Sequence, residues 1–115
     1  MTEEQIALAK RAVACKGWRW MPGMADCYGR RLREGDWLDP AVEFPDLTDP
    51  ATLGCLLALV REAWKGDEWI SCAYARKERS WVVTSCHISA LLVSGKHIHG
   101  VTEVEALVAA LEAAP

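Results

Sequence analysis

The sequence lacks paired cysteines, although it contains five of them. Cys15, Cys27, Cys55, Cys72 and Cys86 are an odd number, and no two of them form a C-x-x-C motif. A disulfide framework needs an even number of cysteines and a zinc ribbon needs close pairs, so the pattern favours neither. We therefore expect the five to be reduced and to act as small hydrophobic residues in the core.

Long apolar runs are also missing. A membrane-spanning helix needs about 20 apolar residues, and no segment of this sequence provides them. The N-terminal stretch M-T-E-E-Q-I-A-L has neither the basic start nor the apolar run of a signal peptide. We expect a cytoplasmic protein without a membrane partner. The net charge of −3 argues mildly against nucleic acid as the main partner.

The common catalytic and cofactor motifs are absent. The sequence contains no Walker loop, no G-x-G-x-x-G after a strand, no H-E-x-x-H and no G-x-S-x-G. Cys86 and His87 are adjacent, so in a strand they would point to opposite faces, which disfavours a cysteine-histidine hydrolase. We predict no cofactor and no catalytic residue, and keep a small enzyme as the third functional alternative.

Three histidines and one cysteine raise the question of a metal. His97 and His99 alternate, so in a strand both rings would leave the same face. Cys86 and His87 would complete four ligands in principle. Zinc sites usually show close ligand pairs at fixed spacing, and only one such pair is present here. We favour solvated or hydrogen-bonded histidines and predict no metal site.

The clearest local structure is a helix over residues 49–65. Asp49 is a good N-cap residue, and Pro50 suits the first helical position. A core-facing stripe at helical spacing contains Leu53, Leu56, Leu57, Val60 and Trp64. Off this stripe lie Thr52, Arg61, Glu62 and Lys65. The pattern predicts an amphipathic helix that packs on the core.

Capping boxes mark two further helices. Thr2 and Gln5 open a short helix over residues 2–15, and Thr102 and Glu105 open a terminal helix that extends to residue 113. The expected apolar face of the terminal helix contains Val104, Leu107, Val108 and Leu111. At 115 residues the chain has room for one domain.

Aromatic and β-branched residues predict the strands. Residues 69–74 and 81–86 flank a charged tip at 76–79 and predict an antiparallel hairpin. Residues 17–24 and 28–38 favour a strand pair or an irregular hairpin, and residues 39–50 favour a surface connection. Residues 88–93 are compatible with a strand or a helical turn, and residues 96–101 could form a last strand. The predicted order is α-β-β-α-β-β-(β)-α, an α+β fold with a mostly antiparallel β-sheet packed with helices.

Three segments carry a family resemblance. They are an early W-x-W-M-P-G-M, a central P-D-L-T-D-P-A-T-L-G-C-L-L-A-L-V-R-E-A-W and a closing T-E-V-E-A-L-V-A-A-L-E-A-A. Together they resemble a family of small tailed-phage and prophage proteins of uncharacterised function, and more loosely the phage α-β-α sandwich domain. The resemblance implies a phage or prophage origin and an accessory role. It is weakest over residues 26–39 and implies no catalytic residue.

An acidic stretch over residues 34–49 is the most distinctive surface candidate, because it contains no lysine or arginine. Aromatic anchors carry affinity and charge steers association, so such a stretch suits a protein with a basic surface. The predicted partner-binding residues are Glu34, Asp36, Trp37, Asp39, Glu43, Phe44 and Asp46. The alternative is a plain acidic connection whose aromatics pack into the core and whose Asp49 only caps a helix.

Two basic clusters near aromatic residues support the nucleic-acid alternative. They contain Arg30, Arg31 and Arg33 in one segment and Arg76, Lys77 and Arg79 in the other. The negative total charge and the frequent occurrence of charge at hairpin tips favour an ordinary solvated surface instead.

The sequence therefore predicts a phage-derived, non-enzymatic protein-interaction module that acts in the host bacterial cell. Its sharpest form is an inhibitor of a host defence complex, similar in size and acidity to anti-CRISPR proteins. The alternatives are a nucleic-acid-associated phage accessory protein that uses the basic clusters, and a small enzyme or metal-binding protein. Fold and size alone do not choose between them.

Overall fold

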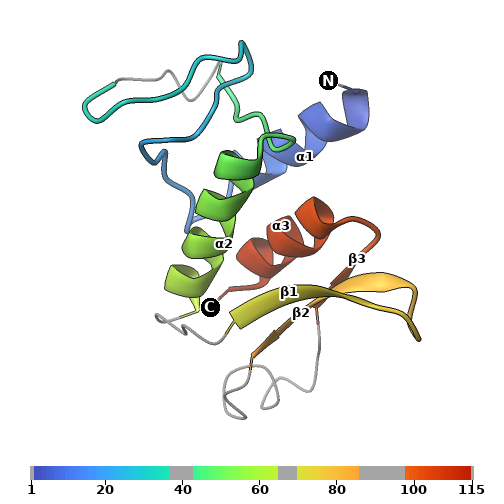
Figure 1. Ribbon diagram of the computed structural model, residues 1–115. Coiled ribbons are helices and arrows are strands. Elements are labelled where there is room, and N and C mark those ends of the chain that lie inside the picture. The colour runs from blue at the N-terminus through green and yellow to red at the C-terminus, as the bar shows by residue number, and fades with distance from the viewer. Residues whose placement is uncertain (1, 37–42, 65–69, 86–97, 115) are drawn as a thin grey trace.

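A computed structural model describes residues 2–36, 43–64, 70–85 and 98–114 (Figure 1). The elements are α1 (Glu3–Val13), α2 (Pro50–Ala63), β1 (Ile70–Ala75), β2 (Ser80–Ser85), β3 (Ile98–Gly100) and α3 (Glu103–Ala113). The sheet has the order β1-β2-β3, with both neighbouring pairs antiparallel. The predicted α+β class is confirmed.

The helix α3 lies at the centre of the molecule. It packs on all three strands and also contacts α1 and α2 (Figure 1). Its buried side chains are Ala106, Leu107, Val108, Ala110 and Leu111. Gly100 allows this helix to approach β3, because a Cβ atom there would lie only 2.8 Å from the Ala106 Cα. The close packing of α3 on the sheet therefore depends on a glycine at the end of β3.

All three helices begin where their capping residues predict. The Thr2 and Gln5 side chains form the reciprocal capping box of α1, and the Asp49 carboxylate accepts a hydrogen bond from the Thr52 backbone N–H. The Thr102 hydroxyl accepts from the Glu105 N–H, whereas the Glu105 side chain bonds the Val101 N–H rather than that of Thr102. The second predicted capping box is thus only half formed.

The buried face of α2 is rotated from the predicted stripe. Leu56 and Val60 are buried as expected, but Leu53 and Leu57 are only partly buried. Leu59 and Thr52 are buried in their place. Thr52 was predicted to lie off the stripe. It is buried because its hydroxyl makes hydrogen bonds that apolar periodicity does not reveal.

The predicted hairpin is present, with Ala75 paired to Ser80 across the tip residues 76–79. One face of the sheet, which includes Ile70, Cys72 and Val83, covers α3. The Cys72 thiol lies 4.0 Å from the Glu103 carbonyl oxygen. The opposite face carries small and polar side chains, of which the Ser80 Oγ lies 3.1 Å from the His99 Nδ1.

Residues 23–36 and 43–48, here called the arm, project at the end of the molecule opposite the sheet (Figure 1). Of the two predicted alternatives, the irregular hairpin is the one observed. Its pairing is confined to single bridges between Ala25 and Arg31 and between Asp26 and Pro45. The strand pair before α2 in the predicted order is therefore absent from the described residues. The connection also contributes to the core, because Pro45 and Leu47 are buried.

The four described cysteines are free thiols, as predicted, but none is fully buried. Cys15, Cys55 and Cys72 pack against the edge of the core. Burial is the main cause that raises the pKa of Cys72 to about 11. The position of Cys86 lies outside the described residues, as does the segment 88–93, for which two alternatives were predicted.

Candidate interaction surfaces

A buried aspartate organises the arm. Asp26 is fully buried, and its Oδ1 accepts hydrogen bonds from the backbone N–H groups of Tyr28 at 2.9 Å and Arg30 at 2.8 Å. Its Oδ2 accepts from the Arg30 Nε at 3.0 Å. These three donors satisfy a carboxylate that would otherwise be costly to bury. The turn over residues 26–30 is therefore held in one conformation.

A second carboxylate ties the arm to α2. Arg31 donates two hydrogen bonds to Asp49, of 2.7 and 3.0 Å. The guanidinium of Arg31 is the largest cause that holds the pKa of Asp49 well below its usual range, and the Thr52 N–H adds to it. The Thr52 hydroxyl donates to Asp49 and accepts from the Ala25 N–H, both at 2.8 Å. The arm and α2 thus share one hydrogen-bonded network.

The predicted acidic surface divides into two parts. Glu34 and Asp36 are exposed. Glu43 is half-buried, with 20% of its side chain exposed, and lies 3.9 Å from the Arg30 Nη2. Asp46 accepts hydrogen bonds from the N–H and hydroxyl of Thr48. The exposed acids on the described arm are therefore Glu34 and Asp36, and the Asp36 carboxylate accepts a hydrogen bond from the Arg33 N–H at 2.8 Å.

The predicted aromatic anchors also differ in position. Phe44 is partly buried against the core, and the Lys10 Nζ lies 5.9 Å from the centre of its ring. Trp37 and Asp39 lie outside the described residues, so their predicted roles remain predictions. Phe44 therefore packs partly against the core and remains partly exposed at the surface.

Tyr28 is an exposed aromatic residue that is not among the predicted partner-binding residues. Its side chain is 75% exposed and stands in a turn closed by the hydrogen bond from the Gly29 N–H to the Asp26 carbonyl oxygen. Gly29 has a φ of 79°, which favours glycine. An aspartate followed by a glycine three residues later is a turn signal, and it offered the one local indication that Tyr28 points outward.

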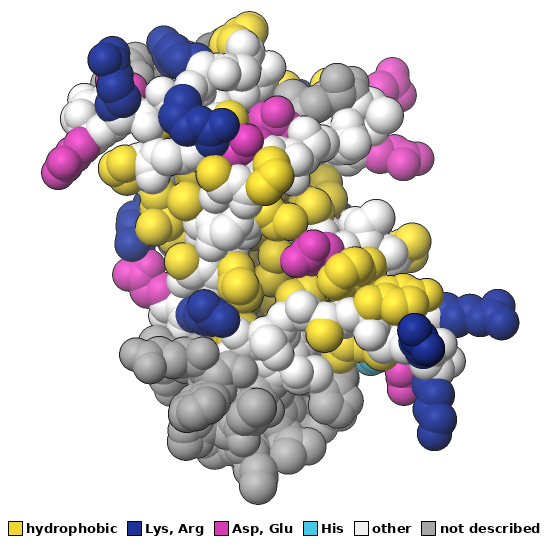
Figure 2. Space-filling view, viewed as in Figure 1, with side chains coloured by type: hydrophobic (Ala, Val, Ile, Leu, Met, Phe, Trp, Pro, Cys, Tyr) yellow, Lys and Arg dark blue, Asp and Glu magenta, His cyan; other side chains and the backbone are white. Residues whose placement is uncertain are grey.

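The structure separates the two predicted basic clusters. In the arm, Arg30 and Arg31 form ion pairs with carboxylates, and Arg33 is exposed. At the hairpin tip, Arg76, Lys77 and Arg79 are all exposed. Their part of the surface is the group of dark blue side chains at the lower right of Figure 2. The two clusters lie at opposite ends of the molecule and do not form one basic surface.

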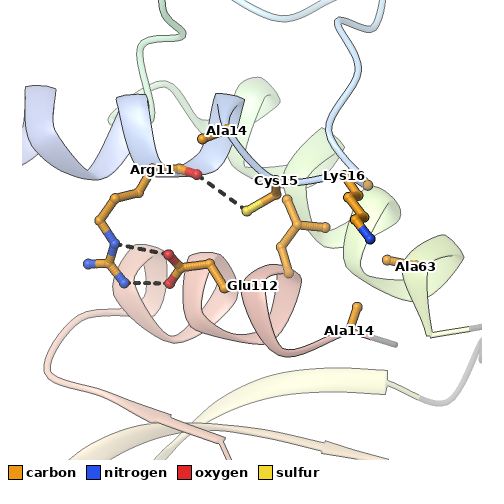
Figure 3. Close-up of a pocket in the computed structure, with 9 residues that line it drawn as sticks. Arg11, Ala14, Cys15, Lys16, Ala63, Glu112 and Ala114 are labelled. Carbon is orange, nitrogen blue, oxygen red and sulfur yellow. Dashed lines mark hydrogen bonds and ion pairs between the residues drawn. The ribbon is translucent and has the colours of Figure 1, made fainter.

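A cavity of about 590 Å³ opens where the C-terminal ends of the three helices meet (Figure 3). Arg11 of α1 donates two hydrogen bonds to Glu112 of α3 at its edge. The Cys15 thiol points into the same region and donates to the Arg11 carbonyl oxygen. Burial raises the pKa of Cys15, which keeps the thiol protonated at neutral pH and disfavours a nucleophilic role.

The predicted absence of a metal site concerns mainly residues that are not described. Cys86, His87 and His97 lie outside the described ranges, and His99 is exposed beside Ser80. Within the described ranges, no group of three or more His, Cys, Asp or Glu side chains is placed to hold a metal ion. None of the helices in those ranges has the length and hydropathy to span a lipid bilayer.

Comparison with protein-family models, with curated proteins and with solved structures gives no match to this chain.

Proposed function

We propose that the protein is a phage-derived, non-enzymatic interaction module that binds a host or phage protein through its arm. The observation that carries this proposal is Tyr28, an aromatic side chain that is 75% exposed on a turn held by a buried carboxylate. Glu34 and Asp36 are exposed on the same arm. The partner surface would be basic, and the site of action would be the cytoplasm of the bacterial host.

The rigidity of the arm supports a binding role. Association loses affinity when loops and side chains must be ordered on binding. Here Asp26 already fixes the turn, and the contact between Arg31 and Asp49 already fixes the arm on α2. A tyrosine has few rotatable bonds, so its contact area is presented at a low entropic cost. The arm is therefore organised before any partner arrives.

Charge and aromatic contact have separate roles in this proposal. Arg33 lies beside Glu34 and Asp36 and offsets part of their charge. Electrostatic steering by the arm would therefore be modest, and most of the affinity would come from Tyr28, with Trp37 as the predicted second anchor. Charge mainly changes association rates, whereas a buried anchor mainly changes dissociation rates.

The sharpest form of the proposal is inhibition of a host defence complex, as in anti-CRISPR proteins. Its support is the resemblance to phage proteins, the small size and the acidic character of the chain. The test is a plating assay in bacteria whose CRISPR–Cas system targets a phage. Expression of the chain should raise the plating efficiency of that phage, and Tyr28→Ala should remove the effect. Unchanged plating in hosts of each CRISPR type would contradict this form.

The interaction itself is tested by binding kinetics with a partner recovered on the immobilised protein. Tyr28→Ala should mainly speed dissociation, and the double variant Glu34→Lys/Asp36→Lys should mainly slow association. The double variant Glu3→Lys/Glu4→Lys is the matched control, because it makes the same charge change on the exposed start of α1. A partner that binds all variants equally would contradict the role of the arm.

A further inference from the structure

The hairpin tip places three cations next to an exposed aromatic ring. Arg76, Lys77 and Arg79 are exposed, and within the described residues no ion pair involves them. Tyr74 is 52% exposed, and its ring meets the Trp81 ring edge-on at a centroid distance of 5.8 Å. In Figure 2 the basic side chains extend from the end of the sheet where an apolar patch ends. The ring is therefore fixed, while the cations are free to follow a ligand.

The backbone at Arg79 is a second and independent observation. Arg79 has a φ of 50°, and it is the one non-glycine residue with positive φ in the described ranges. This left-handed conformation favours glycine or asparagine and is costly for other residues. Glycine or asparagine at position 79 would lower this conformational cost. A strained residue that persists points to a role for its side chain.

A shallow depression adjoins these groups on the sheet. It measures about 280 Å³ and is lined in part by Tyr74, Glu78, Thr84 and His99. The Thr84 hydroxyl and the His99 ring lie on the face of the sheet that points away from α3, whereas the Tyr74 ring lies with Trp81 on the α3 face. A flexible ligand that contacts the cations can therefore reach the aromatic ring on one face or these polar groups on the other.

We propose that the hairpin tip binds single-stranded nucleic acid. The three cations would contact consecutive phosphates, and an unstacked base would pack on Tyr74, the combination that single-strand-binding surfaces use. A duplex fits less well, because its base faces are covered by stacking and only its phosphates would be contacted. The net charge of −3 would confine the contact to the tip, since the rest of the chain repels phosphate. This site does not depend on the arm.

The test is fluorescence anisotropy with a labelled thymidine oligonucleotide and a duplex of equal length, each titrated with the whole protein at several salt concentrations. Three phosphate contacts predict a slope of about −2 for log K against log salt, and loss of one contact reduces it by about 0.7. Arg76→Gln and Lys77→Gln should each show that reduction. Tyr74→Ala should weaken binding by about 5- to 100-fold, the range expected for loss of one stacked base.

Arg79→Asn separates function from folding. Asparagine accepts the left-handed backbone, so the melting temperature should stay equal or rise while oligonucleotide binding weakens. Glu78→Gln removes the acid of the tip and should strengthen binding. Lys16→Gln, which removes an exposed cation of another surface, is the charge control and should bind like the wild type.

The proposal would be overturned if the protein showed no salt-dependent oligonucleotide binding, or if it bound the duplex more tightly than the single strand. It would also be overturned if the tip variants bound as tightly as the wild type, or if Lys16→Gln lost as much affinity as the tip variants. None of these results bears on the arm, because Tyr28 and the tip lie at opposite ends of the molecule. The arm variant Tyr28→Ala should bind the oligonucleotide normally.

Discussion

The arm and the hairpin both project from the helical core, but they use arginine in opposite ways. In the arm, Arg30 and Arg31 contact carboxylates and hold the chain in place. At the hairpin tip, Arg76 and Arg79 extend into solvent. The backbone hydrogen bonds between β1 and β2 already fix the hairpin, whereas the arm has only isolated bridges. A segment without a regular backbone ladder needs side chains to hold it.

This difference shows why a cluster of charged residues in a sequence does not reveal whether those charges are free to bind a partner. The arm clusters three arginines within four residues, much as the hairpin clusters its cations. Folding brings Asp26 and Asp49 against the arm arginines, whereas no carboxylate in the described part of the chain forms an ion pair with the tip cations. Whether a basic side chain stabilises the fold or can bind a partner depends on which distant residue packs against it in the structure.

The largest expected effect on the free energy of unfolding comes from a substitution in the core, which should destabilise both regions. Leu107 is buried at the centre of α3, between the sheet and the other helices. Leu107→Ala should lower the free energy of unfolding by about 2 to 5 kcal/mol, because it removes apolar contacts and leaves a cavity. Leu57→Ala, at a partly buried position of α2, should cost less. Urea denaturation measures both, and an equal loss would contradict the rotated packing of α2.

The next effect should separate the two regions. Asp26→Ala removes three hydrogen bonds to a buried carboxylate and should cost about 2 to 3 kcal/mol. Hydrogen exchange should become faster at the Tyr28 and Arg30 amides and change less at the amides that pair β1 with β2. Asp26→Asn keeps an acceptor oxygen and should lose less. Uniformly faster exchange across both regions would show that the arm is not a separate local unit.

The elements with local signals were predictable from the sequence. Thr2 with Gln5, and Asp49 with Pro50, fix the starts of α1 and α2 through contacts only a few residues apart. The hairpin followed from two runs of β-branched and aromatic residues around a charged tip. These signals act within one turn or one hairpin, so a single sequence contains them.

The arm was not predictable in the same way, because its contacts join distant residues. Arg31 meets Asp49 across 18 residues, and Ala25 meets Thr52 across 27. Hydrophobic periodicity placed Thr52 off the core face of α2, since a threonine counts as a polar residue whether or not its hydroxyl has a hydrogen-bond partner. The same limit applies to the candidate site: the acidity of residues 34–49 was visible, but the partners that shield Glu43 and Asp49 were not.

Acid should weaken the arm through Asp49. Arg31 and the Thr52 N–H lower the pKa of Asp49 in the folded protein below the reference value of 3.8. A depressed pKa stabilises the fold fully above that reference value, and the contribution is lost as the pH falls through the folded pKa. Arg31→Ala should lower the free energy of unfolding only slightly at neutral pH, since the Arg31 side chain is largely exposed and solvent screens its charge.

The measurement is urea denaturation of the wild type and Arg31→Ala from pH 7 to pH 2. The two curves should approach each other as the pH falls below 4, because Asp49 of the unfolded chain is protonated before Asp49 of the fold and the advantage of the ionised, paired carboxylate declines. Arg76→Ala is the control and should follow the wild type at every pH. A constant difference between the wild type and Arg31→Ala down to pH 2 would show that the contact acts through packing rather than charge.

The smallest effect is expected at the hairpin tip, where Arg76→Ala and Lys77→Ala should each change stability by less than about 0.5 kcal/mol. Neither side chain is buried or ion-paired within the described residues, so truncation removes no contact that the fold requires. Arg79→Asn should even stabilise the protein, by about 1 kcal/mol, because it relieves the left-handed backbone. Thermal melts of the three variants beside Arg31→Ala measure the contrast directly. A loss at the tip as large as that at Arg31 would mean that the tip arginines are structural too, and the distinction between the two regions would fail.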